Sequence, residues 1–148
     1  MARASIKQLV WQTRRLFQHL RSVSETLLEE TDINASQRAV LEFLHREQPV
    51  TVPHMAKKLS VSRQHIQVIV NELLEMGLVN AIENPAHKRS PLLETTPSGN
   101  QLFKSIEEME AEFIRKLQKK FPMKDLQTTL ETLQTFDELL TSHAWKDQ

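Results

Sequence analysis

Four polar side chains, Ser62, Arg63, Gln64 and Gln67, are closely spaced at the start of a segment with helical periodicity. An arginine can donate two hydrogen bonds to O6 and N7 of guanine, and a glutamine amide can pair with N6 and N7 of adenine. A serine hydroxyl can reach a phosphate or a base. Such side chains contact base edges when their helix lies in the major groove of DNA, so this segment predicts a recognition helix.

A second basic group, Lys88 and Arg89, lies in the polar loop of residues 84–90. Residues 78–83 alternate as a strand does and residues 91–95 can return beside them, so this stretch predicts a β-hairpin with both cations near its tip. Exposed lysine and arginine side chains suit a minor groove or the phosphates that flank it. The hairpin is therefore the second expected contact with DNA.

Helical spacing and cap residues divide the rest of the chain into elements. Serine, threonine or asparagine residues precede several apolar stretches, and prolines occupy the first turn of two of them. These signals predict helices at residues 6–28, 35–46, 52–59, 63–76, 97–121 and 123–143. Gly77 suits a left-handed end of the fourth helix. Ala39 and Leu59 are expected to face inward, and the expected fold class is mainly α with a small β-hairpin wing.

The composition limits the classes of protein to be considered. Of the 148 residues, 39% are hydrophobic and 26% charged, as in an ordinary soluble globular protein. The absence of cysteine excludes disulfides, thiolate catalysis and cysteine-ligated zinc. The N-terminal segment is amphipathic and lacks the continuous apolar stretch of a signal peptide or membrane span. A cytoplasmic protein without membrane contact is therefore expected.

The net charge of zero, from 19 basic and 19 acidic residues, is unlike that of most DNA-binding proteins. The distribution of the charges matters more than their sum. Between residues 54 and 90 the basic side chains, Lys57, Lys58, Arg63, Lys88 and Arg89, lie where phosphates would be met. Binding through such a local patch should be moderately salt-sensitive.

Three long amphipathic helices, the first, fifth and sixth, extend beyond what a compact winged helix needs. That unit requires only about residues 33–98. The apolar sides of the first, fifth and sixth helices must therefore be buried against another surface. A two-fold dimer in which these helices interlock is the simplest way to provide it. Such a dimer would also place two recognition helices on one face of a duplex.

The order of these elements resembles that of the MarR family of bacterial transcriptional regulators over nearly the whole chain. The specific resemblance lies in the helix pair, VTVPHMAKKLSVSRQHIQVIVNELLEMGLV, and in the hairpin, NPAHKRSPLLETTPSG. In the hairpin, Arg89, Thr96 and Gly99 occupy the family's arginine, threonine and glycine places. The resemblance implies a homodimer bound to double-stranded DNA, with these residues at the major-groove end of the recognition helix: Ser62, Arg63, Gln64, His65 and Gln67.

The resemblance also implies a single domain, residues 1–148, that contains a DNA-binding part and a dimerisation part. The winged helix would span residues 33–97, with the helix-turn-helix at about 51–76 and the wing at about 79–96. Residues 1–32 and 98–146 would form the dimerisation helices.

The chain departs from the family pattern in the wing. His87 stands where the family usually has an aspartate, Thr95 where it has a leucine, and Pro91 lies within the returning strand. A carboxylate beside Arg89 would hold the guanidinium group by a charge-assisted hydrogen bond. Without it, a looser or differently held wing is expected.

The expected function is that of a homodimeric regulator, in the first instance a repressor, on a pseudo-palindromic operator with half-sites roughly 10 bp apart. Trp11, Arg14 and Arg15 are candidates for binding an aromatic acid as effector, the alternative being a tryptophan packed in the dimer interface. Two other readings stay open: an all-helical protein-interaction adaptor without sequence-specific DNA binding, and a DNA-binding dimer without an effector.

No catalytic, metal or cofactor site is expected. The six histidines show no His-x-x-x-His spacing and have no clustered carboxylate companions. A glycine-rich phosphate loop and a nucleophile elbow are also missing from the sequence.

Overall fold

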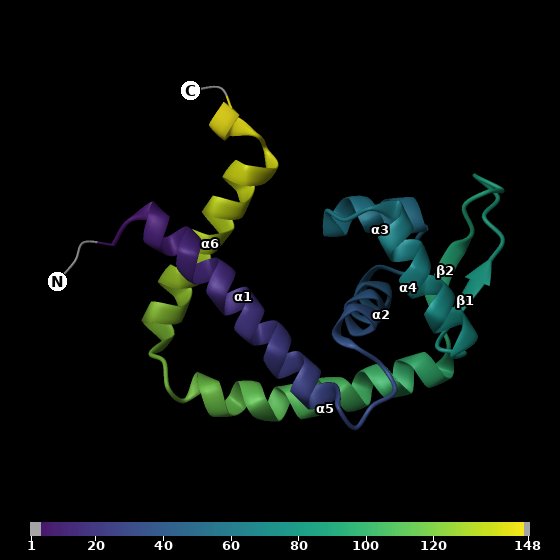
Figure 1. The fold of residues 1–148 in the computed structure, drawn as a ribbon, viewed down its shortest axis with the longest axis horizontal. Helices are drawn as coiled ribbons and strands as arrows, with labels where there is room; N and C mark the ends of the chain where they lie inside the picture. The colour runs from purple at the N-terminus through teal and green to yellow at the C-terminus, as the bar shows by residue number, and fades with distance from the viewer. Residues whose placement is uncertain (1–3, 147–148) are drawn as a thin grey trace. The chain divides into compact units, whose positions relative to one another are not determined.

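The computed structural model describes residues 4–146; residues 1–3 and 147–148, the ends of the single domain expected above, lie outside the described residues. The elements follow in the order α1 (Ile6–Leu28), α2 (Ala35–Glu47), α3 (Val52–Leu59), α4 (Arg63–Glu75), β1 (Val79–Ile82), β2 (Leu92–Thr95), α5 (Pro97–Gln118), α6 (Met123–Thr141) and the short 3₁₀ helix η1 (Ala144–Lys146) (Figure 1). The predicted class, mainly α with a small hairpin, is confirmed. The chain forms two compact units, of which the first ends at Met109 and the second begins at Glu110.

The helices of the first unit begin where a side chain binds their free N–H groups. Asn34 accepts a hydrogen bond from the Gln37 N–H, and the Gln37 side chain accepts one from the Asn34 N–H, both at 2.9 Å. Thr51 caps α3, with a proline in the first turn. Thr96 accepts a hydrogen bond from the Gly99 N–H at 3.0 Å and so caps α5. The cap residues of the sequence therefore determine where these helices start.

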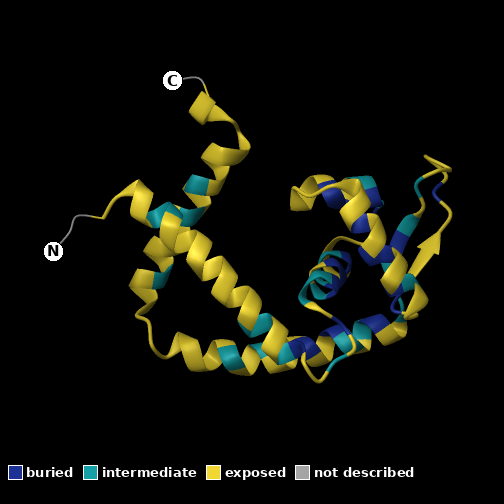
Figure 2. Ribbon diagram, in the orientation of Figure 1, coloured by how far each residue is buried: buried dark blue, intermediate teal, exposed yellow. Residues whose placement is uncertain are grey.

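The core of the first unit is formed by α2, α3, α4, the hairpin and the beginning of α5 (Figure 2). Its fully buried side chains are Val40, Leu41, Leu44, Met55, Ile66, Val70, Leu73, Val79, Leu93, Phe103 and Ile106. Each such side chain stabilises the fold by about 1.5–3 kcal/mol relative to an exposed one. Because α4 is held by its inward side, Ile66, Ile69, Val70 and Leu73, its opposite side faces solvent.

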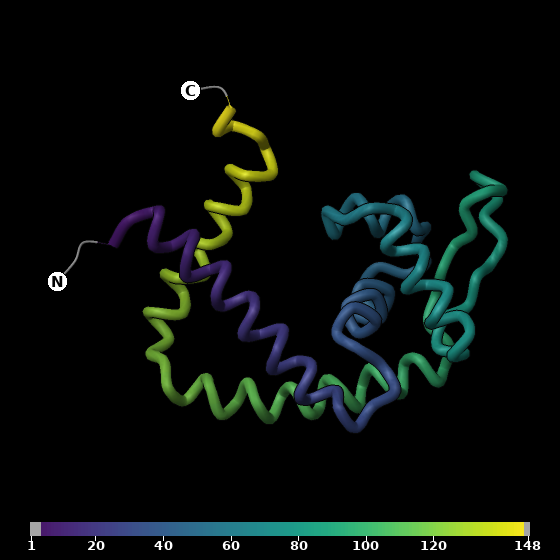
Figure 3. Tube along the Cα trace, viewed as in Figure 1, coloured from purple at the N-terminus to yellow at the C-terminus, as the bar shows by residue number. Residues whose placement is uncertain are grey.

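The hairpin is joined to the helix-turn-helix by main-chain hydrogen bonds. Strand β1 pairs antiparallel with β2 (Figure 3). Val79 lies opposite Thr95 in this pairing. On the other edge of β2, Leu93 exchanges two backbone hydrogen bonds with Val50, just before α3. The returning strand begins at Leu92 rather than at Pro91, which has no N–H to donate. The hairpin is thus positioned relative to α3 and α4.

Two sequence predictions about side-chain direction were wrong. Ala39 of α2 and Leu59 of α3 were expected to face inward, but both are exposed. Both line a groove between α1, α2 and α4, so no neighbouring element covers them there. In α2 the inward position is taken by Leu41, which is completely buried.

The second unit consists of the rest of α5, α6 and η1, and α6 has no buried residue. In α5 the Glu112 carboxylate lies 2.9 Å from Lys116 Nζ. The hydrogen bond from Lys116, and then its charge, lower the pKa of Glu112. The apolar side of α6 remains largely open to solvent, as Leu130, Leu139 and Leu140 show.

Candidate nucleic-acid interface

The turn between α3 and α4 sets the direction of the predicted recognition helix. Ser60 ends α3 in the left-handed conformation at φ 55°, and the Val61 N–H donates to the Ala56 carbonyl at 3.0 Å. Ser62 is extended and its Oγ accepts a hydrogen bond from the His65 N–H at 3.1 Å. The Ser62 hydroxyl keeps its own proton available to a phosphate oxygen, which the helix N-terminus also attracts.

The outward side of α4 carries the polar side chains that the sequence singled out. Arg63, Gln64, His65 and Gln67 are all exposed. Gln67 Nε2 donates a hydrogen bond to Asn71 Oδ1 at 2.9 Å, one turn further along the helix. This bond fixes the direction of the Gln67 amide and leaves its carbonyl oxygen and one N–H free.

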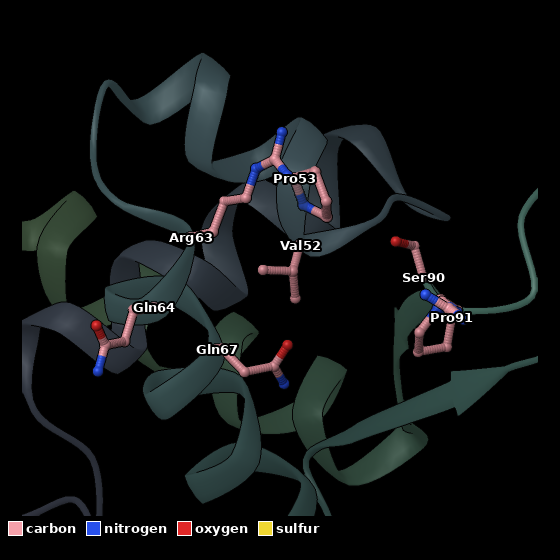
Figure 4. A pocket seen from close by; sticks show the side chains of 8 residues that line it. Val52, Pro53, Arg63, Gln64, Gln67, Ser90 and Pro91 are labelled. Carbon is pink, nitrogen blue, oxygen red and sulfur yellow. The ribbon is translucent and has the colours of Figure 1, made fainter.

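A hollow of about 290 Å³ lies between α4, the start of α3 and the wing loop (Figure 4). Arg63, Gln64 and Gln67 line it from α4, and Arg89 lines it from the wing loop together with Ser90 and Pro91. The start of α3 completes it with Val52 and Pro53. Four of the predicted DNA contacts, on segments more than 20 residues apart, therefore surround one concave surface. Ser62, His65 and Lys88 are not among its lining residues.

The wing loop is held by Asn84, a residue that the sequence analysis did not single out. Asn84 is buried, its Nδ2 donates to the Ser90 carbonyl at 2.9 Å, and its Oδ1 accepts from the Ala86 N–H at 3.2 Å. One side chain thus bridges the two ends of the loop that carries Lys88 and Arg89. Asparagine commonly forms such local bonds in turns, which is the signal that could have identified it.

A long-range hydrogen bond holds α4 against α2. Gln37 is buried, and its Nε2 donates to Glu72 Oε2 at 2.8 Å. The same side chain completes the α2 capping box, so one residue both starts α2 and fixes the second half of α4.

The base of the wing is fixed by polar contacts that end at α5. Thr95, which replaces the family's usual leucine, is buried, and its hydroxyl donates to Gln48 Oε1 at 2.8 Å and lies 2.8 Å from Asn100 Oδ1. The threonine is therefore accommodated by polar partners on the C-cap of α2 and in α5 instead of by apolar contacts alone. The neighbouring Thr96 hydroxyl donates to the Gly77 carbonyl at 2.7 Å.

The predicted effector residues lie on the exposed side of α1. The Arg15 guanidinium carbon is 4.6 Å from the centroid of the Trp11 ring, which is 56% exposed, and Arg14 is also exposed. This is the distance of a cation–π contact. An assignment of Trp11, Arg14 and Arg15 to effector binding stays a prediction.

The groove that borders Ala39 and Leu59 measures about 580 Å³ and belongs entirely to the first unit. Phe17 and Leu20 of α1 and Ile66 and Ile69 of α4 provide apolar lining. Its polar lining includes Arg21, Arg38 and His65. His65, predicted as a DNA contact, therefore borders this groove on the flank of α4.

Among residues 4–146, no group of three or more histidine or carboxylate side chains is placed to hold a metal ion. Within the same residues, no helix is long and apolar enough to cross a membrane.

Comparison with known proteins identifies the winged part of the chain. Residues 31–90 match a family model described as MarR family. The Mycobacterium tuberculosis protein Rv2011c is 39% identical over 62 residues, which are 42% of this chain and 43% of that protein. The match thus spans less than half the length of this relative. An HTH-type transcriptional regulator of Staphylococcus aureus is 23% identical over 131 residues, 84% of this chain and 87% of the relative.

Solved structures extend the similarity to nearly the whole fold. The MarR family transcription regulator SP03579 is 25% identical with a TM-score of 0.84, covering 94% of this chain and 92% of its own. Staphylococcus aureus MarR in complex with salicylate and kanamycin has a TM-score of 0.84 at 17% identity, with 92% of each chain covered. Streptococcus pneumoniae FabT in complex with DNA has a TM-score of 0.78 at 14% identity, with 93% and 99% covered. Residues 31–90 therefore match the MarR family model, and the chain has the fold of MarR family transcription regulators.

Proposed function

We propose that this chain is a sequence-specific regulator that binds a pseudo-palindromic operator as a homodimer and represses transcription from it. The observation that carries the proposal is the concave surface on which Arg63, Gln64 and Gln67 of α4 meet Arg89 of the wing. Side chains whose chemistry suits base edges and phosphates are combined there. That combination suits a duplex better than it suits a protein partner.

In this proposal α4 enters the major groove and the wing follows the backbone to the neighbouring minor groove. Arg63 would bind guanine, and Gln64 and Gln67 would bind adenine, each bidentate contact being worth about 1–3 kcal/mol of discrimination. Arg89 and Lys88 would bind phosphates or the minor groove. The FabT structure, which contains DNA, supports this use of the shared fold.

Uncovered apolar surfaces support the homodimer. On α1, Leu16, Phe17 and Leu20 are all about half exposed or more, and the apolar side of α6 is likewise open. Isolated exposed hydrophobic residues are common, but rows of them along two long helices indicate a surface buried in an assembly. A second copy of this chain offers the same rows, and a two-fold pair would match two half-sites roughly 10 bp apart.

The groove of about 580 Å³ is the proposed effector site, and an aromatic carboxylic acid is the proposed ligand class. Phe17 and Ile69 would enclose a ring and Arg21 or Arg38 would bind the carboxylate. A ligand there touches α4 through His65 and Ile66, so it can favour one position of the recognition helix over another. The salicylate complex of the Staphylococcus aureus neighbour is consistent with this ligand class.

Selection of bound sequences from random DNA, at two salt concentrations, tests the proposal. The expected result is an enriched two-fold-symmetric site. The double variant Arg63→Ala/Gln64→Ala should lose sequence discrimination and remain dimeric. The control Arg46→Ala/Gln101→Ala removes the same residue types from exposed positions outside the surface and should select the wild-type site. Sequence-blind or absent binding by the wild type would instead favour the protein-interaction adaptor.

A further inference from the structure

One apolar side chain lies in the middle of the polar outward side of α4. Val68 is 53% exposed, and the four inward residues of the helix are Ile66, Ile69, Val70 and Leu73. At 100° per residue Val68 points about 150° away from the mean direction of that inward group. Arg63, Gln64 and Gln67 were predicted from the sequence as DNA contacts on this helix, whereas Val68 had no predicted role.

The neighbours of Val68 on the helix surface are residues that point in the same direction. Gln64 lies one turn before it and Asn71 one turn after it, while the Glu72 side chain is bonded to Gln37 of α2. Val68 therefore belongs to the strip of α4 that would face base edges. Local helix formation does not account for a valine at this position, because its propensity is no better than that of serine or asparagine.

The adjacent pair Gln67–Asn71 fixes the kind of base pair that this part of the strip can contact. With one N–H donated to Asn71 at 2.9 Å, the Gln67 amide presents one further N–H and its carbonyl oxygen. That is the donor and acceptor combination for N7 and N6 of adenine. An A·T pair also presents the thymine 5-methyl group in the major groove, where small apolar side chains contact it.

We infer that Val68 is a specificity-determining residue that packs against the 5-methyl group of a thymine in each half-site. Asn71 acts beside it as a positioning residue, since it orients the Gln67 amide for an adenine. The inference rests on the proposed function, because it requires α4 to lie in the major groove. The proposed function names side chains that contact DNA; this inference names one base, thymine, and its 5-methyl group as the partner of Val68.

Replacing thymine by uracil in the selected site removes that methyl group and keeps the base pairing. Each thymine of the half-site is replaced in turn, in both half-sites at once, and binding is measured at constant salt. One position should lose about tenfold in affinity or somewhat more, because each buried methyl group is worth about threefold to fivefold. The other thymine positions should change little.

Variants of Val68 show whether this side chain is responsible. Val68→Ser removes both methyl groups at similar helix propensity, so its affinities for the thymine and uracil sites should become equal. Val68→Ile should keep the preference for thymine. Glu75→Ser, on the same side of α4 but one turn beyond Asn71, should retain the wild-type preference.

The possible results distinguish a failure of the proposed function from a failure of the role assigned to Val68. If no sequence is enriched from random DNA, the proposed function fails and the inference fails with it. If a site is enriched but none of its thymines is sensitive to uracil, the inference alone is overturned. It is also overturned if Val68→Ser keeps the full preference for thymine, because another side chain would then contact the methyl group.

Discussion

Gly99 is the residue whose replacement should most directly disturb the base of the wing. A Cβ atom at this position would lie 2.1 Å from the Leu78 carbonyl oxygen and 3.1 Å from its carbon. Real Cβ contacts essentially never fall below 3.0 Å, so in Gly99→Ala the start of α5 and the Leu78 backbone, which lies between α4 and β1, must separate by roughly 1 Å. The obstacle is backbone, which cannot rotate away as a flexible side chain can.

The separation also strains hydrogen bonds at the same junction. The Thr96 N–H donates to the Leu78 carbonyl at 3.1 Å, and the Thr96 hydroxyl donates to the Gly77 carbonyl at 2.7 Å. Overpacking of this kind costs about 1–3 kcal/mol, and weakening these bonds adds about 0.5–1.5 kcal/mol for each one lost. Alanine recovers about 1 kcal/mol through its helix propensity. We therefore expect Gly99→Ala to lower the free energy of unfolding by about 3 kcal/mol.

Urea unfolding followed by circular dichroism, at equal protein concentration for all variants, measures this loss. Gly77→Ala is the matched control, because its Cβ would meet nothing within 4 Å but its φ of +71° is left-handed. That conformation costs an alanine about 1–2 kcal/mol. Ser98→Ala, at an exposed neighbouring position, should change little. A loss for Gly99→Ala no larger than that for Gly77→Ala would refute the steric argument.

Three further predictions concern the wing and α4. Arg89→Ala should weaken operator binding by about 1–3 kcal/mol in a titration at fixed salt if Arg89 contacts a base edge; no loss would exclude it from the interface. Asn84→Ala should release the wing loop and speed trypsin cleavage at Lys88 and Arg89, because both bonds that bridge the loop are lost; cleavage as slow as in Glu83→Ala, an exposed neighbour, would contradict this role. Gln37→Glu should destabilise the fold by about 1–3 kcal/mol, because it sets a carboxylate at the buried position 37 against the exposed Glu72 carboxylate, where the two side chains now meet at 2.8 Å in a part-buried hydrogen bond. Adding Glu72→Gln should recover most of that loss in a double-mutant cycle, and independent effects would show that the two side chains do not interact.

Local chemistry explains why much of the fold could be predicted. The capping box at Asn34 and Gln37 and the left-handed Gly77 join residues only a few positions apart, so their geometry follows from neighbouring residues. The start of α5 at Pro97 follows equally from Thr96 and the proline itself. Helical spacing likewise identified the inward side of α4, because a helix of known period has a calculable inner face.

The predicted side-chain directions were wrong where a neighbouring element decided them. Ala39 and Leu59 fit an inward pattern on their own helices, but both border the groove between α1, α2 and α4. Periodicity gives the angle of a side chain around its own helix axis and does not say whether another element covers that angle. Val68 shows the converse, since its type suggests burial but about half of it remains exposed.

The ends of α4, α5 and α6 lie one to three residues before the predicted ones. By itself, the sequence determined where the helices begin and which side chains could contact bases. Those features depend on caps, periodicity and chemical type, all of which act over a few residues. Only the tertiary structure decided that Arg89 shares a surface with Gln67, that Gln37 binds Glu72, and that Gly99 meets the Leu78 backbone. These contacts join residues 21 to 35 positions apart, and they exist because the packing of α2, α4, α5 and the hairpin around one core brings distant backbone and polar groups together.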